Sequence, residues 1–174
     1  MSKKIWTTVI SVITVVLLIL LDQWTKWLAI VHLKGSRPIV LIPGVFELNY
    51  TENRGAAFGM LQNQKWFFLI ITLIVVIGVV YLLCRMPLER RYMPLRATLT
   101  ILIAGAIGNL IDRVYLSYVV DFLYFKLIDF PVFNVADCYV TVMVFALVLL
   151  LLFKYKEEDL AFIPGMVSKK DKEV

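Results

Sequence analysis

Two acidic residues of this sequence stand where a carboxylate is costly, and they are the residues best suited to chemistry. Asp121 lies within the largely apolar run YVVDFLYF, and Asp137 heads an apolar stretch that continues from Val140. A buried carboxylate needs hydrogen-bond partners or a counter-charge, because burial without them is unfavourable. Two carboxyls held a few ångströms apart share one proton, so one can accept a proton from water while the other donates to a carbonyl oxygen. This is the chemistry of aspartyl proteolysis, although the residues alone leave open which two acids pair.

Structural roles are open for the neighbouring charged residues. Asp22 and Lys26 are spaced i, i+4, which suits an ion pair on one helix face. Asp112 and Arg113 could end a helix at the membrane surface through a salt bridge. Charged groups inside a membrane span are nevertheless functional candidates by default, so both roles stay open.

Two further short segments have structural interpretations. Asn134 and Asp137 have the spacing of a helix N-cap and an acid at the third helical position. The segment AGAIGNL, residues 104–110, places Ala104, Gly105 and Gly108 where close helix packing needs small residues. We therefore assign these glycines to helix packing and not to a ligand.

Composition predicts a membrane protein with one compact domain over residues 1–174. Of the 174 residues, 61% are hydrophobic, well above the share in soluble domains. A helix needs about 20 apolar residues to cross a bilayer core. The first run resembles a secretory signal, but no small-residue cleavage site follows it, so we expect a retained helix. Four runs approach the required length: about 5–28, 66–84, 97–112 and 136–153.

The distribution of Lys and Arg predicts the orientation of the spans. Eleven lie in the N-terminus, the 85–96 loop and the charged tail 154–174, whereas six lie in loops 33–65 and 113–135. The side richer in Lys and Arg is cytoplasmic. Both termini are therefore expected in the cytoplasm and both long loops outside. The tail is expected to orient and solubilise this end, and to be partly disordered.

Counting residues along the spans brings three acids to one depth. At about 1.5 Å per helical residue, Asp22, Asp112 and Asp137 lie roughly 27, 24 and 26 Å from the nearest basic residue at the cytoplasmic ends of their spans. Asn109 lies one turn deeper. The polar groups are therefore expected to gather near the outer edge of the membrane.

Two other classes of protein have to be weighed. A small transporter or proton-conducting protein would need polar groups across the whole bilayer, but the inner halves of the four spans are nearly all apolar. An assembly or scaffold subunit would not need two opposed acids. The outer loop also contains RPIVLIPGVFELNYT, whose apolar pieces broken by proline and glycine predict a small β element.

Five motifs resemble those of the lipoprotein signal peptidases, the bacterial type II signal peptidases. The likeness spans roughly residues 15–150, and the motifs follow one another in the family's order. They are DQWTKW at 22–27, NRGAAFGML at 53–61, GAIGNLIDRV at 105–114, VVDF at 119–122 and FNVAD at 133–137.

The resemblance implies an all-α polytopic membrane protein of four transmembrane helices, an outer-surface β-cradle and a short surface helix at NRGAAFGML. It implies an aspartic endopeptidase of the inner membrane, sensitive to globomycin, with its site near the outer leaflet. The substrate would be a diacylglyceryl prolipoprotein cleaved before the modified cysteine. We expect membrane lipid around the chain, no cofactor, no metal, no nucleic acid and a monomer.

The resemblance also implies a role for each candidate residue. Asp121 and Asp137 would be catalytic. We expect Arg113 to pair with a nearby carboxylate. Asp22, Lys26 and Asp112 would be structural polar residues, while the supporting or substrate-binding residues would be Asn53, Gly55, Asn109, Arg113 and Asn134.

Overall fold

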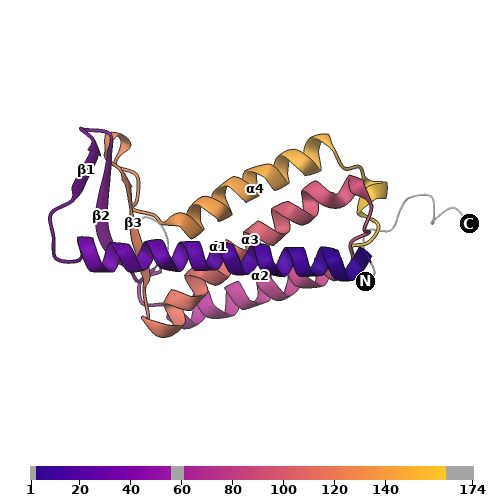
Figure 1. The fold of residues 1–174 in the computed structure, drawn as a ribbon, viewed down its shortest axis with the longest axis horizontal. Coiled ribbons are helices and arrows are strands. Elements are labelled where there is room, and N and C mark those ends of the chain that lie inside the picture. The colour runs from indigo at the N-terminus through magenta and orange to yellow at the C-terminus, as the bar shows by residue number, and fades with distance from the viewer. Residues whose placement is uncertain (1–2, 56–60, 164–174) are drawn as a thin grey trace, which may run out of the picture.

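Four long helices make up most of the structure, a computed structural model that describes residues 3–55 and 61–163. They are α1 (Lys3–Leu33), α2 (Lys65–Arg85), α3 (Met93–Tyr115) and α4 (Val135–Phe153), and each is long and apolar enough to cross a membrane. Figure 1 shows the helices running lengthwise, with a small sheet at one end and the start of α1 at the other. We call these the sheet end and the opposite end. The predicted four-span architecture is confirmed.

Two helices are longer than the sequence predicted. Helix α1 has 31 residues and α3 has 23, where runs of about 5–28 and 97–112 were expected. At about 1.5 Å per residue α1 is roughly 46 Å long, more than the ~30 Å hydrocarbon core. Its extra turns bury Ala29 and Leu33 against the sheet, and a proline in the first turn of α3 suits an earlier start.

Helix α3 packs against the other three helices and is the most buried of the four. Its glycines permit close approach. A Cβ at Gly105 would lie 2.7 Å from the carbonyl oxygen of Ala136, and one at Gly108 would lie 2.6 Å from Asp22 Oδ2. Both distances are too short for a side chain, so the predicted small-residue packing face is confirmed.

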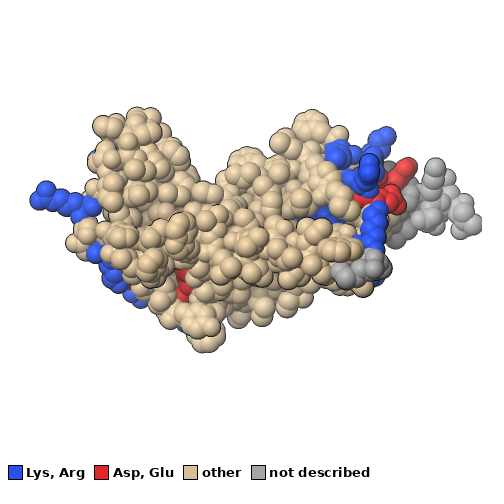
Figure 2. All heavy atoms as spheres, viewed as in Figure 1, with Lys and Arg blue, Asp and Glu red and all other residues tan. Residues whose placement is uncertain are grey.

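The remaining helix surfaces are apolar and exposed. Helix α2 fully buries none of its 21 residues, and the most apolar stretches of α1 and α4 consist almost entirely of exposed or half-buried residues. Figure 2 shows that charged side chains gather toward the two ends of the visible face, with an uncharged belt between them. Such a belt would be unfavourable in water and suits a bilayer.

A three-stranded antiparallel sheet forms the sheet end. Strands β1 (Ile39–Ile42) and β2 (Phe46–Asn53) come from the loop where a β element was predicted, and β3 (Val119–Phe125) completes the order β1-β2-β3. The third strand was not predicted, because an apolar run of this length is also compatible with lying on the membrane. In the fold, Val120 and Phe122 pack against the end of α1. Residues 56–60 of the predicted surface helix lie outside the described residues.

The first part of the charged tail folds back at the opposite end. A short 3-10 helix, η4 (Glu157–Leu160), places Asp159 2.6 Å from the Nε of Arg91, and the Tyr155 hydroxyl donates to the Arg91 carbonyl oxygen at 2.7 Å. Tyr92 stacks on Tyr155. Residues 154–163 are therefore held against the segment that precedes α3. Residues 164–174 lie outside the described residues.

Candidate active site

A cavity of about 580 Å³ opens at the sheet end, and both candidate catalytic acids line it. Asp121 comes from β3 and Asp137 from the first turn of α4. One wall is polar and is formed by Asn53, Gly55 and Arg113. The other is largely apolar, with Phe125 from the end of β3 and with Ile128, Phe130, Pro131, Val132 and Phe133 from the segment between β3 and α4. The sequence did not predict this apolar wall as part of the site.

The carboxylate of Asp121 is fixed by two side-chain amides. Its Oδ1 accepts a hydrogen bond from Asn134 Nδ2 at 2.6 Å, and its Oδ2 accepts one from Asn53 Nδ2 at 2.9 Å. The oxygen of the Asn53 amide accepts from the Gly55 N–H at 3.0 Å, which sets the direction of that amide. Asp121 is 1% exposed. Burial, together with the charge of Asp137, raises the pKa of Asp121 to about 7.

Asp137 is held by the start of its own helix and by α3. Asn134 and Asp137 form a capping box, in which the Asp137 N–H donates to Asn134 Oδ1 at 2.9 Å and the Asn134 N–H donates to Asp137 Oδ2 at 3.1 Å. Asn109 Nδ2 donates to the other oxygen at 2.7 Å. The capping interpretation is therefore confirmed, and the cap also brings Asp137 into the cavity.

Asn134 joins the two acids. Its side-chain amide donates to Asp121, while its backbone N–H donates to Asp137. It is completely buried, so both of its donors are shielded from bulk solvent. The two carboxylates are therefore held as one unit by a single asparagine.

A buried ion cluster lies beneath the site. Lys26 Nζ is 2.9 Å from Asp22 Oδ2 and 3.0 Å from Asp112 Oδ2, and it donates to Asn109 Oδ1 at 2.9 Å. The ion pair predicted from the i, i+4 spacing is confirmed. The predicted convergence of Asp22, Asp112 and Asp137 is supported as well, because Asp22 Oδ1 accepts from the Ala136 N–H, next to Asp137.

The ion cluster also connects separate elements. Asp112 Oδ2 accepts a hydrogen bond from the Val120 N–H at 3.0 Å, which attaches α3 to β3 next to Asp121. Gln23 was not singled out from the sequence, although it stands beside Asp22. Its amide donates to Asp112 Oδ1 at 2.9 Å and to the Gly108 carbonyl oxygen at 3.1 Å.

Arg113 differs from the expectation. Among the described residues no carboxylate lies within ion-pair distance of its guanidinium, so the predicted pairing with a carboxylate is wrong. The guanidinium lies 4.7 Å from the ring centroid of Phe68 and makes long hydrogen bonds to the carbonyl oxygens of Asn109 and Gly55, at 3.4 and 3.5 Å. Arg113 therefore lines the cavity with its charge unpaired by a neighbouring acid.

No group of three or more His, Cys, Asp or Glu side chains placed to hold a metal ion occurs within residues 3–55 and 61–163. Cys138 lines the cavity beside Asp137, and both cysteines are free thiols.

The four spans and the buried polar cluster at one end define an integral membrane protein with an enzyme-like site. The model of a known family, signal peptidase II, matches residues 14–153. The lipoprotein signal peptidase of Streptococcus thermophilus strain CNRZ 1066 is 45% identical over 147 residues, which are 84% of this chain and 93% of that protein. The Streptococcus pyogenes serotype M1 relative is 42% identical over 148 residues, 85% of this chain and 94% of the other.

Two solved structures of bacterial membrane enzymes share the fold. One has a TM-score of 0.71 at 33% identity, and the match covers 83% of this chain and 94% of the chain in that structure. The second has a TM-score of 0.70 at 30% identity, and the match covers 91% of this chain and 94% of the chain in that structure. The chain belongs to the lipoprotein signal peptidase family, and its membership identifies it as a membrane peptidase.

Proposed function

We propose that Asp121 and Asp137 are the catalytic dyad of an aspartyl endopeptidase that removes signal peptides from prolipoproteins, cleaving before the diacylglyceryl-modified cysteine. The observation that carries the proposal is the position of both carboxylates on one cavity, joined through the buried Asn134. Neither carboxylate has a cation within ion-pair distance among the described residues. Such a pair retains one proton between its two carboxyls.

In the proposed reaction the ionised carboxyl takes a proton from a water molecule as the water oxygen attacks the scissile carbonyl carbon. The protonated carboxyl donates its proton to the carbonyl oxygen, which gives a tetrahedral gem-diol. The intermediate then breaks its C–N bond, and a proton passes to the leaving nitrogen. Each acid has fixed amide or backbone donors on both oxygens, so the geometry of the pair is set before the substrate binds.

The cavity walls suit a lipidated peptide. The apolar segment Phe130–Phe133 offers a surface for acyl chains, whereas Asn53, Gly55 and Arg113 present polar groups on the facing side. In this proposal Asn53 and Asn134 support Asp121, and Asn109 supports Asp137. Gly55 and Arg113 contact the substrate backbone. The reaction needs no metal.

The proposed topology follows from the eleven-to-six distribution of Lys and Arg. The sheet end faces outward from the bacterial inner membrane, and both termini are cytoplasmic. A substrate signal helix then has its basic end in the cytoplasm and its modified cysteine at the depth of the dyad. We propose that a monomer is sufficient, because both acids come from one chain.

The test is incubation of the purified protein with a diacylglyceryl-modified prolipoprotein, followed by detection of the released signal peptide. The unlipidated precursor is the matched control and should not be cleaved. Chelator should leave the rate unchanged. Loss of activity in chelator with recovery on adding zinc would contradict the aspartyl mechanism, and equal cleavage of both precursors would contradict lipid recognition.

A further inference from the structure

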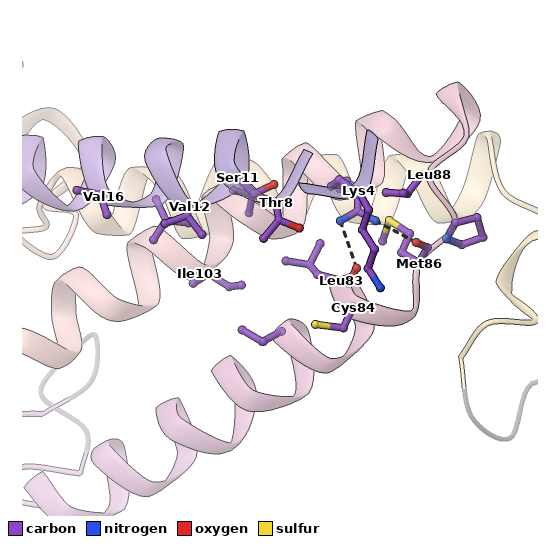
Figure 3. A pocket seen from close by; sticks show the side chains of 15 residues that line it. Lys4, Thr8, Ser11, Val12, Val16, Leu83, Cys84, Met86, Leu88 and Ile103 are labelled. Atoms are coloured by element: carbon purple, nitrogen blue, oxygen red, sulfur yellow. Dashed lines mark hydrogen bonds between the residues drawn. The ribbon is translucent and has the colours of Figure 1, made fainter. Parts of the chain in front are cut away.

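A second large cavity lies at the opposite end of the bundle, away from the site. It encloses about 560 Å³ between the first turns of α1, the last turns of α2 and the first half of α3. Figure 3 shows Lys4, Thr8 and Val12 of α1 on one side of it and Leu83 and Cys84 of α2 on the other. None of its lining residues lines the active-site cavity.

Two buried polar atoms of this cavity's wall have no hydrogen-bond partner within the part of the chain that the structure describes. Arg96 uses Nη1 and Nη2 to donate to the carbonyl oxygens of Leu83 and Met86, at 3.2 and 3.0 Å, but its Nε is unpartnered. The Thr100 hydroxyl is unpartnered as well. The two residues are 7% and 3% exposed. Buried polar groups are normally satisfied, so protein side chains leave the hydrogen bonding of this wall incomplete.

The charge of the cavity is positive. Arg96 has no carboxylate within ion-pair distance among the residues that the structure describes, and Lys4 stands exposed on the lining. The remaining walls are mainly apolar, with Val12, Val16 and Ile103 among them. A ligand that fits must therefore combine a hydrocarbon chain with a negative group.

We propose that this cavity binds an anionic phospholipid, with one acyl chain along the apolar wall and the phosphate near Lys4 and Arg96. Anionic headgroups are attracted to Lys and Arg at a membrane surface. The phosphate supplies acceptors for the exposed ammonium group of Lys4, and the buried guanidinium of Arg96 adds positive charge to the same cavity wall. A lipid can enter sideways, since α2 fully buries none of its residues against the rest of the bundle.

Neighbouring features favour this occupant. The basic end of a signal helix would be repelled by Lys4 and Arg96. A smaller cavity of about 300 Å³ adjoins the first and shares Ser11, Arg96 and Thr100 with it. The region beneath the first turns of α1 is therefore incompletely filled by protein side chains, as a lipid site requires.

The test compares phosphatidylglycerol with phosphatidylcholine of the same acyl chains. Each lipid is added to the purified protein in nonionic detergent, and binding is measured by native mass spectrometry. We expect at least tenfold tighter binding of phosphatidylglycerol. Lys4→Gln should weaken that binding at least threefold, whereas Lys3→Gln, which removes a neighbouring charge outside the cavity lining, should change it less than twofold.

Two further variants keep the result interpretable. Ser11→Phe places a ring in the cavity and should weaken phosphatidylglycerol binding while leaving prolipoprotein cleavage unchanged. Thr100→Val removes one unpartnered hydroxyl and should raise the melting temperature of the lipid-free protein. Arg96 is not the decisive variant, because it also holds the C-terminal end of α2.

Equal binding of the two lipids would overturn the proposal, as would equal losses in Lys4→Gln and Lys3→Gln. Inorganic phosphate alone should not compete with the lipid at millimolar concentration. Competition at that level would mean that the cavity is a phosphate site and not a lipid site. The binding and melting measurements do not depend on catalysis, so they remain informative even if the proposed dyad is wrong.

Discussion

Lys26 Nζ donates a hydrogen bond to Asn109 Oδ1 at 2.9 Å, and together with a second one from Asn134 Nδ2 at 3.1 Å this contact decides which side of the Asn109 amide faces Asp137. With its oxygen held by Lys26, the amide presents its NH₂ group to Asp137 Oδ1 at 2.7 Å. A flipped amide would place its oxygen against a carboxylate. The buried ion cluster therefore acts on the site by orienting a hydrogen-bond donor.

Replacing Lys26 should destabilise the protein strongly. Lys26→Met keeps most of the side-chain length but leaves Asp22 and Asp112 buried without their cation, and such losses cost about 3–5 kcal/mol. Thermal unfolding in detergent measures the effect. The control is Lys34→Met, which breaks the more exposed pair with Glu52 and should lower the stability far less, because exposed ion pairs are screened by water. Similar losses of stability in both variants would mean that the buried cluster stabilises the protein no more than an exposed ion pair does.

Removing either acid of the dyad should abolish cleavage. Asp121→Asn and Asp137→Asn should each leave less than a tenth of wild-type turnover per folded enzyme, a barrier increase above about 1.4 kcal/mol. The double variant should be no slower than either single one, because the pair works as a unit. Asp129→Asn, which changes an exposed acid of the same outer segment, should remain active.

The amide variants also carry a structural cost. Both oxygens of each acid accept hydrogen bonds, so an introduced NH₂ group must face another donor. Turnover must therefore be normalised to folded protein. A variant of Asp121 or Asp137 that keeps more than about a tenth of the rate contradicts the dyad.

Activity should fall as pH rises above neutral. The pKa of Asp121 is raised to about 7 by burial and by Asp137, so this carboxyl keeps its proton to a higher pH than an exposed aspartate. Above that pH both acids ionise, and no proton remains for the carbonyl oxygen. The profile of kcat/KM against pH should show an alkaline limb near pH 7. Constant activity up to pH 9 would contradict a shared proton.

Arg113→Ala should reduce turnover more than stability. Within residues 3–55 and 61–163 its guanidinium makes only long hydrogen bonds and a contact with the Phe68 ring, so no buried acid there loses an ion-pair partner. We expect at least a tenfold loss of kcat/KM, with a stability loss of about 1 kcal/mol for the ring contact. Arg113→Lys keeps the charge and should recover part of the rate. A stability loss as large as that of Lys26→Met would show that Arg113 is mainly structural.

Single cysteines should report opposite sides of the membrane. The background is Cys84→Ser with Cys138→Ser, which should stay active because the proposed mechanism uses no thiol. Arg90→Cys in the inner loop and Val40→Cys in β1 are both exposed. An impermeant maleimide applied to sealed cells should label only the Val40→Cys protein. Labelling of both from the same side would contradict the four-span topology.

Local patterns in the sequence were sufficient for the spans and for part of the site. Apolar runs of membrane length determine the helices, because a buried backbone in lipid must satisfy its hydrogen bonds within the helix. The Asp22–Lys26 pair and the Asn134–Asp137 cap were also predictable, since each depends on a spacing within one helix. For contacts between helices, the sequence predicted only that Asp22, Asp112 and Asp137 lie at a common depth, and not which residues pair.

Contacts between distant segments were decided by the tertiary structure alone. The run around Asp121 becomes a strand because Val120 and Phe122 pack against α1 and the backbone pairs with β2. The same packing turns Asp121 toward Asn53 and Asn134, which come from two other segments. Arg113 was expected to pair with an acid, but its sequence neighbour Asp112 pairs instead with Lys26 from a different helix. Spacing along one helix cannot specify such partners, because they depend on how α1, α3 and α4 approach one another across Gly105 and Gly108.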